Sequence, residues 1–291
     1  MELEHVQADE LWVKRVGGKL WLALALAVPT RLWLGGVLGG SRDARFLANL
    51  ANQVRACARS LTLLVCVDGL AGYPTAFKKA FRERMRTHKT GIWKKVPAPG
   101  LLIGQLVKDY SKHRLVGSSV RLVQGTAAEV AAVLARTGSG RQIQTAYIER
   151  LNATFRSKLA VLGRRTRNLA RQETTLTAGM YLVGCLYNFC WPHRSLRQRA
   201  APGAGRKWAE RTPAMAAGLT AHCWTVEELL RYALPPPPWV PPKRRGRPPK
   251  KPRPIPWKLR PPKPVPPKRR GRPPLPRGPD GKILRPAAPQ P

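Results

Sequence analysis

The sequence predicts an α/β fold, in which helices flank a mixed β-sheet, followed by a disordered tail. The first 86 residues read as three strands, a helix, a fourth strand and a second helix, an order that begins antiparallel and then crosses over through a helix. Residues 61–70 (LTLLVCVDGL) form a continuous apolar run, which is typical of a strand buried on both faces. Residues 235–291 hold 23 of the 30 prolines, so we expect a disordered tail after a folded domain over residues 1–234.

The three leading strands are expected over residues 5–13, 19–28 and 31–40, which are rich in Leu, Trp and Val. The short Pro-Thr connection between the second and third predicts a hairpin. Ser41 is the expected N-cap of a helix over residues 44–59, which leads to the strand at 61–70. A second helix is expected to follow that strand, over residues 73–86 with Pro74 in its first turn.

The second half of the domain is predicted to be mostly helical. The final segment has Thr212 as a cap and Glu227 and Glu228 early in a last short helix. The other expected elements are a Pro- and Gly-rich loop (90–104), an extended stretch (105–124), a short helix (126–136), a basic helix (147–171) and an apolar helix packing across the sheet (173–190).

The basic helix has an apolar stripe at helical spacing and a single acid, Glu149, near its start. Seven cationic residues follow that acid: Arg150, Arg156, Lys158, Arg164, Arg165, Arg167 and Arg171. A solvated helix normally mixes both signs, so this pattern indicates a polyanion-binding surface. On such a helix Glu149, Arg156 and Arg167 fall on one line. Glu149 is then either an acid that complements the helix dipole or a metal-binding carboxylate at the edge of that surface.

The charge balance of the whole chain points to the same class of partner. It has 53 Lys and Arg against 15 Asp and Glu, a formal net charge of +38, and residues 1–234 still carry +22 without the tail. Nucleic acid is the first candidate partner and a membrane surface the weaker one. The most apolar run, residues 20–29, has half the length that a membrane span needs, and no signal peptide is recognisable, so we expect a cytoplasmic protein.

The five cysteines contain no CxxC pair, which favours a reducing compartment and free thiols. Zinc ligands could come from a set near the end of the domain, although their spacing matches no zinc-finger pattern. Because Cys185 and Cys190 lie in an apolar helix, buried thiols are the favoured interpretation. That set is Cys185, Cys190, His193, His222 and Cys223.

Three carboxylates indicate a metal site. Asp9 lies in the first predicted strand, Asp68 closes the buried strand, and Glu149 begins the basic helix. An acid in an apolar strand is costly unless it is paired or binds an ion, and three such oxygens suit Mg²⁺. Each acid also has a simpler interpretation: Asp9 is a strand-edge solubiliser, with Glu10 an equal candidate, and Asp68 before Gly69 is a turn signal.

Four strings carry a family resemblance: VQADELW, VDGLAGYP, AYIERLNATFR, and TPAMAAGL followed by WTVEEL. With them the chain resembles the insertion-element transposases of the DDE superfamily, in particular the insertion-sequence-1 type. The similarity covers about residues 3–231, and the strings fall in the family's order. The resemblance implies an RNase H-like fold with a five-stranded mixed sheet, in a bacterial protein associated with the nucleoid.

The resemblance also assigns residues. It implies Asp9, Asp68 and Glu149 as catalytic acids that bind two Mg²⁺ or Mn²⁺ ions. These ions would assist attack of water on a phosphodiester at the element's end, and the freed 3′-hydroxyl would then attack target DNA. Asn152 and Arg156 follow the Glu on the same face and are expected to hold DNA phosphate. Arg164 and Arg165 are further expected DNA contacts, and pairing of two element ends implies a homodimer or a larger assembly.

One departure from the family lies at the start of the chain. Relatives of this type begin with a zinc-binding and helix-turn-helix segment that recognises the element's ends. Here the first catalytic strand is expected from residue 5. We therefore expect end recognition either to be encoded elsewhere or to be lost, which leaves autonomous activity open.

The tail contains the string PPKRRGRPP twice, at 241–249 and 266–274. The motifs at 243–249 and 268–274 resemble AT-hooks, in which glycine lets the backbone approach the minor groove and arginines enter it. The alternative is a generic basic tail that binds any polyanion. The residues expected to contact A·T-rich DNA are Arg245, Gly246, Arg247, Pro248, Arg270, Gly271, Arg272 and Pro273.

Three functions are therefore compatible with the sequence: an active DDE transposase, a non-catalytic A·T-rich DNA-binding protein derived from one, and a structure-selective nuclease on the same fold. The presence of all three acids favours the first function over the second. The strings outside those acids, TPAMAAGL above all, favour the first over the third.

Overall fold

The computed structural model describes residues 1–86, 93–112, 114–200, 202, 205, 207–233, 277 and 279–281. Residues 1–234 form one compact unit, which contains nearly all of the described residues. Both AT-hook-like motifs, with the eight residues assigned to them, lie outside the described residues, and so does nearly all of the predicted tail.

The main sheet has six strands in the order β3-β2-β1-β4-β7-β8. Strand β1 pairs antiparallel with β2 and parallel with β4, and β4 pairs parallel with β7, so the sheet is mixed as predicted. The expected count of five strands was wrong, because residues 105–124 belong to an antiparallel hairpin whose second arm adds a sixth strand. The strands are β1 (His5–Arg15), β2 (Gly18–Ala27), β3 (Leu32–Gly39), β4 (Leu63–Asp68), β7 (Leu101–Ser111) and β8 (Arg114–Gln124).

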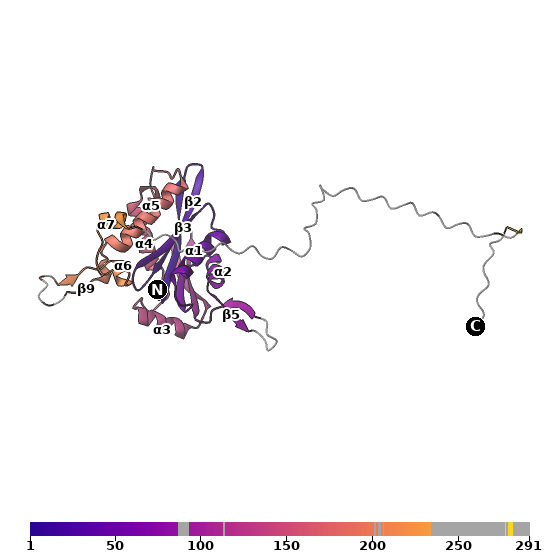
Figure 1. Ribbon diagram of the computed structural model, residues 1–291, viewed down its shortest axis with the longest axis horizontal. Helices are drawn as coiled ribbons and strands as arrows, with labels where there is room; N and C mark the ends of the chain where they lie inside the picture. The colour runs from indigo at the N-terminus through magenta and orange to yellow at the C-terminus, as the bar shows by residue number, and fades with distance from the viewer. Residues whose placement is uncertain are drawn as a thin grey trace. The chain divides into compact units, whose positions relative to one another are not determined.

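Helices α1 (Ala44–Cys57) and α2 (Gly72–Ala80) cover one face of the sheet (Figure 1). Their apolar stripes, which include Phe46, Leu50 and Phe77, pack on residues of β1, β2 and β4 that point to that face. The N-cap of α1 is Asp43, not the expected Ser41. The Asp43 carboxylate accepts from the Phe46 N–H at 2.8 Å, and Ser41 donates its hydroxyl to Asp43 at 2.7 Å.

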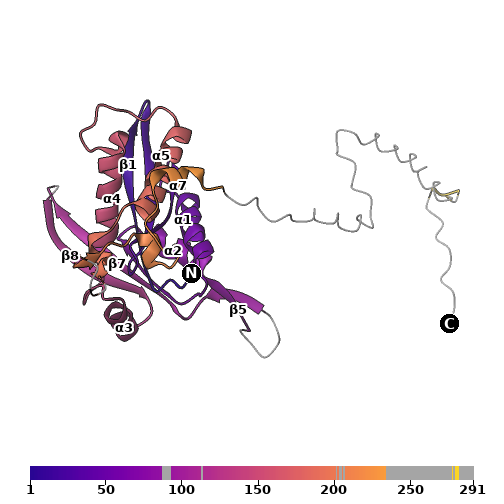
Figure 2. The same ribbon diagram turned by 60° about the vertical axis from the view of Figure 1, so that its left-hand side comes forward.

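Three helices cover the opposite face: α3 (Ala127–Thr137), α4 (Ala146–Lys158) and α5 (Glu173–Cys185) (Figures 1 and 2). Helices α4 and α5 pack on alternate residues of β1 and β2, while α3 packs on β4 and β7. Helix α3 follows its prediction closely, with a capping box between Thr126 and Glu129. The sheet is therefore buried between two helical layers over its central strands.

The helix predicted over 73–86 was wrong in its second half. Helix α2 ends at Ala80, and β5 (Arg82–Arg86) pairs with β6 (Trp93–Pro97) in a separate ribbon, so the loop predicted over 90–104 was also wrong. Phe81 is fully buried like Tyr73 and Phe77 at helical spacing, but its backbone leaves the helical conformation (φ −102°, ψ 73°), so the helix ends there. In β5 the arginines alternate with Glu83 and Met85 along an extended strand, so their like charges do not stack on one helix face.

The basic helix predicted over 147–171 was too long. Helix α4 ends at Lys158, a single 3₁₀ turn covers η1 (Ala160–Leu162), and the remaining residues are not helical. Continuing the helix past Gly163 would bring the clustered arginines together within one turn. In the observed turn, the Thr166 hydroxyl accepts a hydrogen bond from the Asn168 N–H, which replaces a helical backbone bond. Arg167 therefore does not share a helix face with Glu149.

The apolar helix predicted over 173–190 is confirmed as α5, which continues through a π-helical turn, η2 (Leu186–Cys190). Thr212 caps α6 (Pro213–Ala216) as expected, and Thr225 caps α7 (Val226–Arg231), which contains Glu227 and Glu228. The remaining elements are η3 (Arg194–Leu196), β9 (Gln198–Arg199) and β10 (Trp208–Ala209). Over the described part of the chain, no helix has the length and apolarity to cross a membrane.

Candidate active site

Asp9 and Asp68 lie where the pairing between two neighbouring parallel strands ends. The last paired residues of β1 and β4 are Ala8 and Val67, and the two acids come next along each strand. One oxygen each from Asp9, Asp68 and Glu10 lie within 4.8 Å of one another. Because β1 continues past this point along β2 while β4 stops, the carboxylates lie where the sheet opens. Such a group of oxygens can hold a metal ion.

Glu10 is the third member of this acidic group, and it points to the face covered by α1 and α2. Its side chain is only 3% exposed. Arg42, just before α1, donates to one carboxylate oxygen at 2.8 Å, and the Tyr73 hydroxyl of α2 donates to the other at 2.8 Å. Glu10 therefore already has partners for both oxygens.

Glu149 lies in the first turn of α4 and lines the same cavity of about 390 Å³ as Asp9 and Asp68. Its carboxylate is not within the tight acidic group. It accepts from the Lys108 ammonium and, at 3.1 Å, from the Thr145 hydroxyl. The structure thus brings all three predicted acids to one cavity, with Asp9 and Asp68 close together and Glu149 on the wall.

The electrostatics of the site favour a bound cation. Burial raises the pKa of Asp9 to about 7, and the negative charges of Asp68, Glu10 and Glu149 act in the same direction. Burial and the charge of Glu10 raise the pKa of Asp68 as well, while the Leu70 N–H, Arg42 and Lys108 oppose that rise. These carboxylates are close together without enough positive charge to neutralise them. A divalent cation would supply that charge.

Asn152 has a different environment from the one expected for a phosphate contact. It is 3% exposed, and its Nδ2 donates to Asp9 Oδ2 at 2.8 Å. Its Oδ1 is buried and has no hydrogen-bond partner among the described residues. The side chain therefore orients the Asp9 carboxylate, and it keeps one buried acceptor that no described residue uses.

Arg156, one helical turn further along α4, lies between Asp9 and a basic cavity. Burial and the nearby charge of Arg164 lower the pKa of Arg156, while Asp9 raises it. Arg156 and Arg164 line a cavity of about 310 Å³ together with Trp12 and Lys14 of β1. Arg165 is exposed and does not line that cavity. A phosphate group could bind there next to the acids.

Several residues of the candidate site were not predicted from the sequence. Lys14 and Lys108 lie in strands, and nothing in the sequence distinguishes them from other surface lysines. Gln105 of β7 is 1% exposed and donates to the Asp68 and Leu70 carbonyls at 3.0 and 3.1 Å, which fixes the turn after Asp68. A buried polar residue in an apolar strand was the only available signal.

The thiols and histidines considered as zinc ligands do not form a metal site. Within the described residues, the acidic group is the one set of His, Cys, Asp and Glu close enough to share an ion. Cys185 and Cys190 are half-buried, so the expectation that both are buried was wrong. The sole fully buried thiol among the five is Cys66, which contacts the ring of His5.

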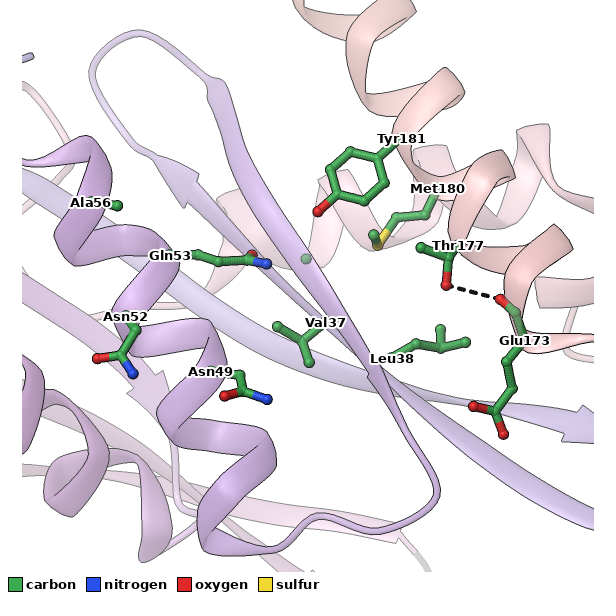
Figure 3. A pocket seen from close by; sticks show the side chains of 11 residues that line it. Val37, Leu38, Asn49, Asn52, Gln53, Ala56, Glu173, Thr177, Met180 and Tyr181 are labelled. Carbon is green, nitrogen blue, oxygen red and sulfur yellow. Dashed lines mark hydrogen bonds between the residues drawn. The ribbon is translucent and has the colours of Figure 1, made fainter. Parts of the chain in front are cut away.

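A larger cavity, of about 570 Å³, lies at the edge of the sheet between α1, β3 and α5. Figure 3 shows its side chains, which include the amides of Asn49, Asn52 and Gln53. Its one carboxylate, Glu173, pairs with Arg15. This cavity lacks a group of acids, so the cavity at Asp9 remains the candidate site.

A comparison with protein-family models found no match for this sequence. No curated protein matches it either.

Proposed function

We propose that this chain is a DNA transposase of the DDE kind, with an RNase H-like catalytic domain that cuts DNA at the ends of a mobile element and joins them to target DNA. The observation that carries the proposal is the meeting of Asp9, Asp68 and Glu149 in one cavity. They come from the first strand, the end of the fourth strand and a later helix, the three places that the family resemblance implies. The order β3-β2-β1-β4-β7 supports it too, with β8 as an addition.

The residues of the site fit a hard divalent cation. All of the donors are carboxylate oxygens, which are the ligands that such a cation prefers. Bound Mg²⁺ or Mn²⁺, held by Asp9, Asp68 and Glu149, would make water and then a 3′-hydroxyl more nucleophilic and stabilise the leaving oxygen.

The protein's own residues supply orientation and charge. Asn152 holds Asp9 Oδ2, and Gln105 fixes the turn after Asp68. The basic cavity at Lys14, Arg156 and Arg164 would hold the DNA backbone, so that the scissile phosphate lies over the acids. The paired-end assembly, the A·T-rich contacts of the tail and a place at the nucleoid belong to the same proposal.

The test is strand transfer by the purified full chain, with Mg²⁺ or Mn²⁺, on DNA that carries the flanking element's ends. The Glu149→Gln protein is the matched control, since it removes one charge and keeps the shape of the side chain. We expect joining that requires the metal and that the control loses. Cleavage of branched DNA without joining would instead identify a nuclease. If both proteins bind A·T-rich DNA but neither cleaves nor joins it, the chain is a non-catalytic binding protein.

A further inference from the structure

Gln7 is a fully buried polar residue of β1, two positions before Asp9 and on the same face of the strand. Its side chain makes three hydrogen bonds, all to the backbone of one short segment. Its Nε2 donates to the Gln144 carbonyl at 2.7 Å, and its Oε1 accepts from the N–H groups of Tyr147 and Ile148 at 3.1 and 3.0 Å. One side chain thus connects β1 to the start of α4.

Helix α4 has no local cap of its own. The N-cap residue, Thr145, makes no side-chain bond to the first-turn N–H groups and donates its hydroxyl to Glu149 instead. Those N–H groups need an acceptor, which in most helices is a side chain at the N-cap. Here Gln7, about 140 residues away in sequence, supplies it.

We propose that Gln7 is a positioning residue that sets the distance between Asp9 and Glu149; this rests on the proposed function. Asp9 follows Gln7 by two residues in a rigid strand, and Glu149 follows Ile148 directly in the helix. The three hydrogen bonds therefore fix the two acid-bearing elements relative to each other, next to the acids. Loss of these bonds would let the start of α4 move and would loosen the metal site. Residues that orient metal ligands typically change metal affinity by about 10- to 100-fold when they are removed.

The chain offers a matched control for a purely structural role. Asn188 of η2 is also buried, and its amide also makes hydrogen bonds to the backbone. It accepts from the Trp33 N–H and donates to the Trp33 carbonyl, each at 2.9 Å. It acts on the edge strand β3, and neither Asn188 nor Trp33 lines the acidic cavity. Gln7→Met and Asn188→Met each remove one bridging amide of this kind.

The experiment measures two quantities for the full-length wild type and both variants: amide hydrogen exchange over residues 144–150 and the dissociation constant for Mn²⁺ added alone. We expect both variants to lower the melting temperature. Only Gln7→Met should speed exchange at the start of α4 and weaken Mn²⁺ binding, by about 10-fold. If Gln7→Met does not fold, Gln7→Asn keeps the amide with a reach shorter by one methylene and should show the same changes at smaller size.

Equal Mn²⁺ affinity in Gln7→Met and Asn188→Met would overturn the inference. So would unchanged exchange at the start of α4. A wild type that binds no Mn²⁺ would count against the proposed metal-dependent function instead, and the exchange measurement would still decide whether Gln7 holds the helix.

Discussion

Asp9 and Glu10 are neighbours on β1, yet their carboxylates have opposite surroundings on the two faces of the sheet. On the face of α1 and α2, Glu10 is matched by Arg42 and Tyr73. On the face of α4, Asp9 accepts from two neutral donors, the Asn152 amide and the Glu10 backbone N–H, and its pKa is raised to about 7. The difference teaches that burial of an acid does not by itself mark a reactive group. The acid that lacks a counter-charge is the one available to a cation.

The largest expected effect concerns catalysis. Asp9→Asn should lower metal-dependent strand cleavage by about a thousandfold or more, equivalent to about 4 kcal/mol of transition-state stabilisation, because it removes a ligand charge. Glu10→Gln should lower it by about 10-fold or less, since Arg42 and Tyr73 already occupy that carboxylate. Single-turnover cleavage of labelled DNA measures both. Equal losses would erase the distinction between the two acids and make Glu10 a direct ligand.

The second effect concerns stability without metal. Ionising Asp9 opposes folding, because its pKa is 3.8 ordinarily and about 7 in the folded protein. The free energy of unfolding therefore begins to fall as the pH rises above about 4, and the fall is complete above about 7. Asp9→Asn should therefore be more stable than wild type at pH 8 in EDTA, by at most about 4 kcal/mol, and equally stable near pH 4.

Chemical denaturation across that pH range, with Glu10→Gln as the comparison, provides the measurement. Glu10→Gln should be less stable than wild type at pH 8, since it removes the charge that Arg42 binds. If Asp9→Asn is also less stable than wild type at pH 8, a positive charge neutralises Asp9 in the folded protein, as Arg42 does for Glu10.

The smallest effect tests the partners of Glu10. Tyr73→Phe removes one donor to that carboxylate in a fully buried position and should lower the free energy of unfolding by about 1 kcal/mol. Cleavage should remain within about twofold of wild type, because the ring still packs against α1. A fall in the cleavage rate of more than about twofold, under conditions where the variant is still folded, would show that the hydroxyl acts in the site on the other face.

The strands that carry the acids were predictable, whereas their surroundings were not. The apolar run ending at Asp68 and the pattern around Asp9 reflect local burial, which sequence records directly. The partners of Glu10 lie 32 and 63 residues away, and those of Gln7 about 140 residues away, so only the folded chain brings them together. The end of α4 at Lys158 was missed for a related reason, since apolar spacing continued to Leu162 although the backbone no longer followed it.

The amide of Asn188 has a consequence for how this chain is made. It covers the backbone of Trp33 on the open edge of β3, but it lies 155 residues later in the sequence. At roughly 5 to 20 residues per second, a ribosome needs about 8 to 30 s to synthesise that interval. During this time the hairpin of β2 and β3 has emerged, but the Asn188 amide that covers the Trp33 backbone has not. That edge is a place for a chaperone to bind, or for nascent chains on one messenger to pair with each other.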